Sequence, residues 1–271
     1  MIRARAALLS TAAFAALVVA GSGVGGTDAV LVNWVPATTV APSGLPVAPF
    51  RYARDNLAGL VTADVVHPAL GPGMVVLGLD GPRADGTAWF VADQAVDLGG
   101  VVAGPRRVIA TGGAAGSAAI AFDLAALADG VRIDAIASRD GSELLFSIDG
   151  HATLPGGLAA GPADVIRLAG GAYARLFDAS AANVPDGADV VGLEVAPDGR
   201  LLLAFDTAIA PSGTAFARGD IVAWAPAANP AWSLFYRPAT VHAGLDELAL
   251  RDFSVRFEPR PDILLVDGFE G

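Results

Sequence analysis

The chain has 271 residues, of which 54% are hydrophobic and 17% charged, and it contains no cysteine. This composition excludes an intrinsically disordered chain and a small domain held together by disulfides. Its net charge of -11 also argues against a nucleic-acid partner, because binding to phosphates requires a basic surface. The 33 glycines and 18 prolines indicate many short elements joined by turns.

Residues 1–20 have the pattern of a secretory signal peptide. Arg3 and Arg5 precede an apolar run of small residues, and Val18 and Ala20 are small enough for cleavage before Gly21. A membrane anchor would need about 20 apolar residues, which is longer than this run. We therefore expect a secreted or periplasmic protein with no membrane span after removal of the signal peptide.

A glycine pattern follows directly after the signal peptide. Gly21, Gly23 and Gly26 match the G-x-G-x-x-G fingerprint of dinucleotide sites, but that fingerprint works only between a strand and a helix. We therefore expect no nucleotide cofactor.

An internal repeat dominates the rest of the sequence. The segments 86–93, 141–149 and 199–206 each begin with a glycine preceded by aspartate, continue through apolar residues and end at an aspartate. Together with a weaker first copy, they predict a single repeat domain over residues 28–258. Its copies cover approximately residues 28–85, 86–140, 141–198 and 199–258, and a tail of residues 259–271 follows.

Each copy contains four short runs of β-prone residues, which predicts an all-β fold. Asp-Gly pairs such as Asp140-Gly141 and Asp198-Gly199 are typical of tight hairpins. The Ala-rich residues 117–130 could form a short helix, but their match to the other copies favours a strand and a loop. About four units of four antiparallel strands favour a β-propeller, and a β-sandwich or an open stack of repeats is the alternative.

A closed ring requires the two chain ends to pair. We expect residues 245–250 to supply the innermost strand of the N-terminal copy. Residues 253–257 are a competitor that could take the place assigned to residues 29–34.

The third of the three strongly matching segments, with the sequence PDGRLLLAFD at residues 197–206, resembles a repeat of uncharacterised secreted bacterial proteins. The resemblance covers roughly residues 75–250. Residues 263–271 are similar to the short D-G-F-E endings of many secreted proteins from GC-rich Gram-negative bacteria. The resemblance implies a propeller-like fold and secretion, and it implies no particular chemistry.

The sequence predicts no catalytic residue, because G-x-S-x-G, H-E-x-x-H, C-x-x-C and P-loop motifs are all absent. His67 and His242 fall in corresponding loops of the first and fourth copies, which explains both by repetition. His151 has no counterpart in the other copies. Neither a shared metal site nor a Ser-His-Asp arrangement is favoured.

Repeated acids and two aromatic residues are the remaining candidates for a site. The acids could form a calcium-binding ring or act as catalytic carboxylates, but we favour the capping of turns by their own side chains. Trp232 and Tyr236 could face a ligand groove, although core packing is the usual role of such rings. The acidic candidates are Asp149, Asp164, Asp206 and Asp220.

We therefore expect an exported, non-catalytic repeat protein that binds an unknown ligand or cell-surface component. One alternative is a secreted hydrolase or lyase with a carboxylate or calcium site at the mouth of the ring. The other is a structural or assembly component of the cell envelope.

Overall fold

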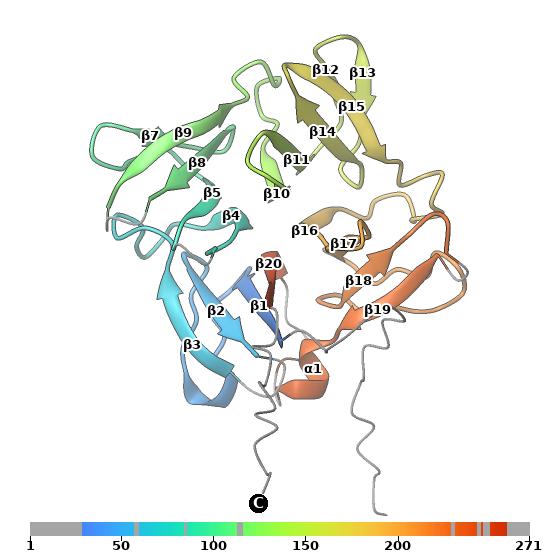
Figure 1. The fold of residues 1–271 in the computed structure, drawn as a ribbon, viewed down its shortest axis with the longest axis horizontal. Coiled ribbons are helices and arrows are strands. Elements are labelled where there is room, and N and C mark those ends of the chain that lie inside the picture. The colour runs from blue at the N-terminus through green and yellow to red at the C-terminus, as the bar shows by residue number, and fades with distance from the viewer. Residues whose placement is uncertain are drawn as a thin grey trace, which may run out of the picture.

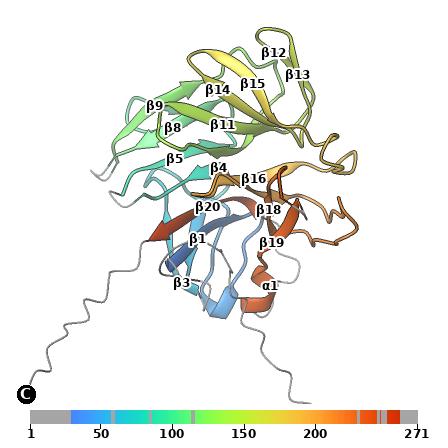
Figure 2. The same cartoon turned by 45° about the vertical axis from the view of Figure 1, so that its right-hand side comes forward.

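A computed structural model describes residues 29–56, 60–83, 86–112, 116–228, 231–242, 245 and 250–258. Four antiparallel sheets of four strands each are arranged around a common centre, as Figure 1 shows. The predicted all-β propeller with four blades is therefore confirmed. Figure 2 shows the same blades in an oblique view.

The strands of each blade follow in order from the innermost to the outermost. Blade 1 contains β20 (Leu250–Glu258), β1 (Ala29–Pro36), β2 (Arg51–Asp55) and β3 (Leu60–Val65). Blade 2 contains β4 (Val76–Asp80), β5 (Ala88–Ala92), β8 (Arg107–Thr111) and β9 (Ala118–Asp123). Blade 3 contains β10 (Ile133–Ala137), β11 (Glu143–Ile148), β14 (Val165–Ala169) and β15 (Ala172–Phe177). Blade 4 contains β16 (Val190–Val195), β17 (Leu201–Phe205), β18 (Ile221–Trp224) and β19 (Trp232–Tyr236).

Short elements interrupt this pattern. A small hairpin of β6 (Val96–Asp97) and β7 (Val102–Ala103) lies in blade 2, and another of β12 (Ala152–Leu154) and β13 (Leu158–Ala160) lies in blade 3. The described helices are a 3-10 turn, η1 (Pro42–Gly44), and one turn of α-helix, α1 (Pro238–Val241). Residues 118–123 form β9, so the Ala-rich segment is a strand, as expected.

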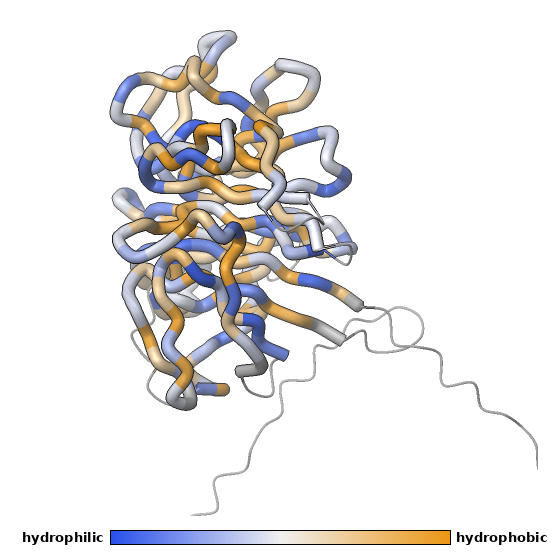
Figure 3. The backbone as a smooth tube through the Cα atoms, turned by 90° about the vertical axis from the view of Figure 1, so that its left-hand side faces the viewer, coloured by the Kyte–Doolittle hydropathy of each residue, from blue (hydrophilic) through white to orange (hydrophobic). Residues whose placement is uncertain are grey.

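The second strands of blades 2, 3 and 4 form the centre of the core. All residues of β5, β11 and β17 are buried, because neighbouring blades cover both of their faces. Figure 3 shows apolar residues concentrated in the body of the blades and hydrophilic residues at several turns. Gly141 and Gly199 have φ values of +81° and +84°, which is the backbone conformation that the Asp-Gly pairs predicted.

The two chain ends close the ring within blade 1. Strand β1 pairs with β20 from Ala29 opposite Glu258 to Pro36 opposite Leu250. Closure by the chain ends is thus confirmed, but the innermost strand is residues 250–258 and not residues 245–250. Residues 246–249 lie outside the described residues.

The competing segment 253–257 also has a different position from the expected one, because it lies in the innermost strand while residues 29–34 keep the second position. The repeat period explains the error. A spacing of 57 residues relates Leu79, Ile136 and Leu193 and would place Leu250 beside them at the axis. The last inner strand instead brings Asp252 and Phe253 there.

Phe253 needs a glycine opposite it. A Cβ atom on Gly192 would lie 2.6 Å from a ring carbon of Phe253, so only glycine leaves room for the ring. The closing strand is therefore fitted to blade 4 by packing as well as by backbone pairing.

Candidate ligand-binding site

The repeated aspartates after the second strands bind backbone groups. Asp149 accepts a hydrogen bond from the Arg132 N–H at 2.8 Å, and Asp206 accepts one from the Asp189 N–H at 2.9 Å. Asp93 does the same for the Val75 N–H at 2.9 Å. Each carboxylate ties the end of a second strand to the start of an inner strand.

Asp164 and Asp220 lie elsewhere, before the third strands of blades 3 and 4. Asp164 accepts a hydrogen bond from the Gly161 N–H at 3.0 Å, and Asp220 accepts one from the Ala217 N–H at 2.8 Å. The four acidic candidates therefore have separate capping roles. In the described part of the chain, no three His, Asp or Glu side chains group as metal ligands. Calcium binding stays the less favoured, untested alternative to capping.

Both aromatic candidates are buried and not on a groove. Trp232 is 4% exposed and packs edge-on against Phe177. Tyr236 is 3% exposed, and its hydroxyl donates a hydrogen bond to Asp55. The usual core role describes both side chains.

Two of the three histidines have internal partners. His242 Nε2 lies 2.5 Å from the Asp55 carboxylate, so Asp55 joins His242 and Tyr236 across the seam between blades 4 and 1. His67 is buried and accepts a hydrogen bond from the Ala69 N–H through Nδ1. His151 is exposed and lies in blade 3.

Sequence reasoning missed a buried carboxylate at the ring axis. The two oxygens of Asp252 accept N–H groups from Leu79 at 2.6 Å, Ile136 at 3.3 Å, Leu193 at 3.2 Å and Phe253 at 2.7 Å. One carboxylate thus binds the inner strands of all four blades. Burial raises the pKa of Asp252 well above its usual range, and the N–H bonds oppose that rise.

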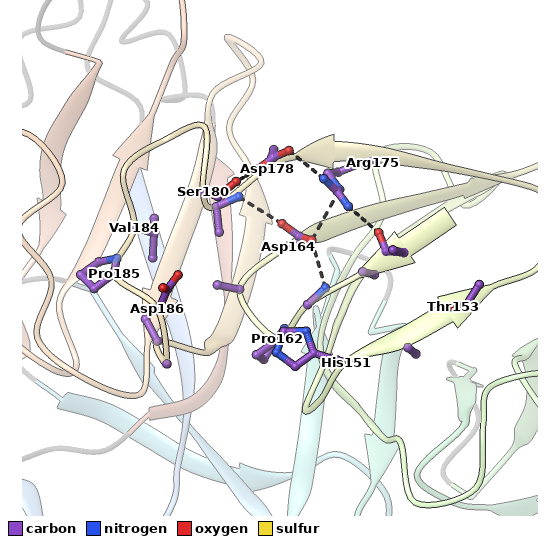
Figure 4. A pocket seen from close by; sticks show the side chains of 18 residues that line it. His151, Thr153, Pro162, Asp164, Arg175, Asp178, Ser180, Val184, Pro185 and Asp186 are labelled. Atoms are coloured by element: carbon purple, nitrogen blue, oxygen red, sulfur yellow. Dashed lines mark hydrogen bonds and ion pairs between the residues drawn. The ribbon is translucent and has the colours of Figure 1, made fainter. Parts of the chain in front are cut away.

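A cavity of about 770 Å³ lies beside blade 3, between the β12–β13 hairpin, the outer strand β15 and the loop that leads to β16. Figure 4 shows His151, Asp164, Arg175, Asp178 and Asp186 around it. Many of the other lining residues are alanine, glycine or proline, which leave backbone and space accessible to a ligand.

Arg175, which lines the cavity, is bound by other residues of the same lining. Arg175 pairs with Asp178 at 2.7 Å and with Asp164 at 3.5 Å, and it donates a hydrogen bond to the Ala159 carbonyl oxygen. Because all three of its nitrogen atoms have partners, this arginine has little capacity left to bind an anion.

The corresponding positions in blades 2 and 4 hold opposite charges that pair directly. In blade 2, Arg107 at the start of the third strand lies 3.2 Å from Asp123 at the end of the outer strand. In blade 4 the order is reversed, with Asp220 2.5 Å from Arg237. There the corresponding space shrinks to a cavity of about 30 Å³.

Blade 3 breaks this pattern, because both positions are acidic. Asp164 stands at the start of the third strand and Asp178 at the end of the outer strand, with Arg175 inserted from the strand itself. Hydrogen bonds from the Ala181 N–H, the Ser180 hydroxyl and Arg175 lower the pKa of Asp178 to about 2. Repetition alone does not explain this arrangement.

Two ionisable side chains of the cavity remain uncommitted. His151 and Asp186 are exposed and have no hydrogen bond or ion pair to another described residue. Counting Asp164, Asp178 and Asp186 against Arg175, the lining carries two net negative charges when His151 is neutral. The cavity is therefore suited to a ligand group that carries positive charge.

No family model and no curated protein matches the chain. Among solved structures, a luciferin-regenerating enzyme is 14% identical, with 66% of this chain and 53% of that chain covered and a TM-score of 0.32. A protein of unknown function from Bacteroides caccae is 9% identical, with 73% and 62% covered and a TM-score of 0.31. YCF48 bound to a D1 peptide is 12% identical, with 77% and 67% covered and a TM-score of 0.26.

The chain thus spans 53% and 62% of the lengths of the first two neighbours. The four-bladed fold of this chain is established by its own strand pairing. The described residues include no helix with the length and hydrophobicity that a membrane span requires.

Proposed function

We propose that the protein is an exported, non-catalytic binding module whose blade 3 cavity receives a positively charged group of its ligand. Residues 1–20 support export through their signal-peptide pattern. The observation that carries the binding site is the acidic pair Asp164 and Asp178, at positions where blades 2 and 4 hold neutral ion pairs.

The chemistry of the lining supports binding over catalysis. A carboxylate such as Asp178, with a pKa of about 2, is a weak base, and the Ser180 hydroxyl already donates its proton to that carboxylate at 2.7 Å. A hydrolase or lyase would also need an imidazole or carboxylate held in place to move a proton, and His151, the imidazole of this lining, has no orienting hydrogen bond to another described residue. The partner is therefore a ligand or a cell-surface component that presents an amine or a guanidinium group.

Calorimetric titration with two matched probes tests the proposal. N-acetylargininamide carries a guanidinium group, and N-acetylcitrullinamide replaces it with an uncharged group of nearly the same shape. We expect the arginine probe to bind and the citrulline probe to bind up to about fivefold more weakly, since one exposed ionic contact contributes up to about 1 kcal/mol. Equal binding of both probes, or none, would contradict the proposal.

A variant pair locates the contact. Asp186→Asn removes an uncommitted carboxylate from the lining and should weaken the arginine probe by a similar factor. Asp129→Asn is the control, because the Asp129 side chain is fully exposed in blade 2 and pairs with Arg106 at 3.1 Å. The control should bind like the unmodified protein.

A further inference from the structure

The hydroxyl of Ser147 lies between two acceptors. Its Oγ is 2.7 Å from Asp134 Oδ1 and 2.7 Å from the Val190 carbonyl oxygen. A hydroxyl has a single proton, and a carbonyl oxygen has none to give. Both short contacts are satisfied when Asp134 is protonated and donates to Ser147, which in turn donates to Val190.

A second carboxyl group, that of Asp189, lies beside Asp134. Asp134 Oδ2 and Asp189 Oδ1 are both buried, and neither has a hydrogen-bond donor among the described residues. The two side chains lie within hydrogen-bond reach of each other. Two carboxylates in such contact cannot both be ionised, so this contact also requires a proton.

The surrounding charges favour protonation. The pKa of Asp189 is raised to about 7, mainly by burial and also by the charges of Asp206 and Asp149, whereas Asp134 and Arg251 oppose the rise. Burial and the charge of Asp189 raise the pKa of Asp134 well above its usual range. Arg251 on β20 is a cation that lowers the pKa of Asp189.

The pair is specific to the seam between blades 3 and 4. A spacing of 57 residues relates Asp189 to Arg132 and to Val75, neither of which is acidic. It also relates Asp134 to Leu77 and Val191. The aspartates that cap the inner strands of blades 2 and 3 therefore do so with no acid at the position of Asp189.

The position of Asp189 links the pair to the binding cavity. Residues 184–188, which form one wall of the cavity, end immediately before Asp189. The Val190 N–H also donates to the Pro162 carbonyl oxygen at 3.2 Å, and Pro162 is another lining residue. Loosening this seam would therefore move two parts of the lining.

The geometry points to a proton-operated latch in which Asp134, Ser147 and Asp189 fasten blade 3 to blade 4 and release the cavity wall as pH rises. The sign follows from linkage. The folded state binds these protons more tightly than the unfolded chain, so the stability they contribute is present at low pH. It is lost as pH rises through about 7, where Asp189 gives up its proton.

Hydrogen exchange tests the latch without any ligand. Val190 and Ile133 occupy equivalent positions, and each donates its N–H to a proline carbonyl, at 3.2 Å to Pro162 and at 2.9 Å to Pro105. We expect the protection factor of Val190 to fall about tenfold between about pH 6 and pH 8, because the opened state holds fewer protons than the closed state only until the pH passes the closed-state pKa of Asp189, about 7. The protection factor of Ile133 should change much less.

Asp134→Asn provides the matched variant. Its amide nitrogen can donate to an ionised Asp189 while its oxygen accepts from Ser147, which then gives up its hydrogen bond to Val190. No contact of the pair then needs a titrating proton, so the pH dependence of Val190 protection should disappear. Asp189→Asn serves the same purpose if the first variant does not fold.

Three results would overturn the latch. Equal changes at Val190 and Ile133 would show that the seam is not special. An undiminished pH dependence in the variant would exclude the carboxyl pair. Recovery of Val190 protection in the unmodified protein on adding calcium near pH 8 would show that a cation, and not a proton, closes the contact.

Discussion

Replacement of Asp252 by asparagine tests how the ring is closed at its axis. Each of the two carboxylate oxygens of Asp252 accepts two backbone N–H groups, one pair from Leu79 and Ile136 and the other from Leu193 and Phe253. An amide keeps one acceptor oxygen and turns an NH₂ group toward the other pair. Two buried N–H groups then lose their acceptor, at about 1–3 kcal/mol each.

We expect Asp252→Asn to lower the free energy of unfolding by about 2–5 kcal/mol, because relief from burying a charge offsets part of the loss. For a chain of this size, that corresponds to a melting temperature roughly 10 °C lower. Thermal and urea unfolding of the mature protein measure the change, with Asp129→Asn as the exposed control.

An unchanged melting temperature would refute this reasoning. A neutral Asp252 already carries a proton that an amide can imitate, so the substitution would then cost little. The outcome therefore decides whether an ionised carboxylate holds the four inner strands together.

Three further predictions concern packing, the last seam and export. Gly192→Ala should lower the melting temperature by several degrees because its Cβ would lie 2.6 Å from the Phe253 ring, and Phe253→Leu in the same chain should restore part of the loss. Tyr236→Phe removes a donor from buried Asp55 and should cost about 1–3 kcal/mol in urea unfolding, whereas no loss would show that the seam does not need this bond. The exported protein should have an intact mass that begins near Gly21, and retention of residues 1–20 would indicate a membrane anchor.

Repetition made the blades predictable from sequence. The Asp-Gly turns and the closing aspartates recur with the period of the blade, and both have local roles that a sequence pattern can reveal. The last step of the ring was not predictable in the same way. Blade 1 takes its inner strand from the far end of the chain. The position of that strand follows the packing of Phe253 against Gly192 and not the 57-residue spacing of the other inner strands.

The candidate site depends on departures from the repeat, which self-comparison tends to overlook. The strand register is needed to see that Asp164 and Asp178 are two acids at positions that face each other. The same register places Arg107 and Asp220 at the position of Asp164 in blades 2 and 4, where each has a partner of opposite charge. Likewise, Asp134 and Asp189 are far apart in sequence and meet only because blades 3 and 4 are neighbours. A useful signal was nevertheless present for Asp134, which is an acid within the otherwise apolar strand β10.

Mapping the arginine probe by amide chemical shifts is the measurement that tests the proposed binding site most directly. Residues 151–164 and 175–188 contain the whole lining of the cavity. N-acetylargininamide should shift amides within these two segments and leave the corresponding residues 217–220 and 237–239 of blade 4 unchanged. Shifts centred on blade 4 or spread evenly over the four blades would contradict a binding site in blade 3.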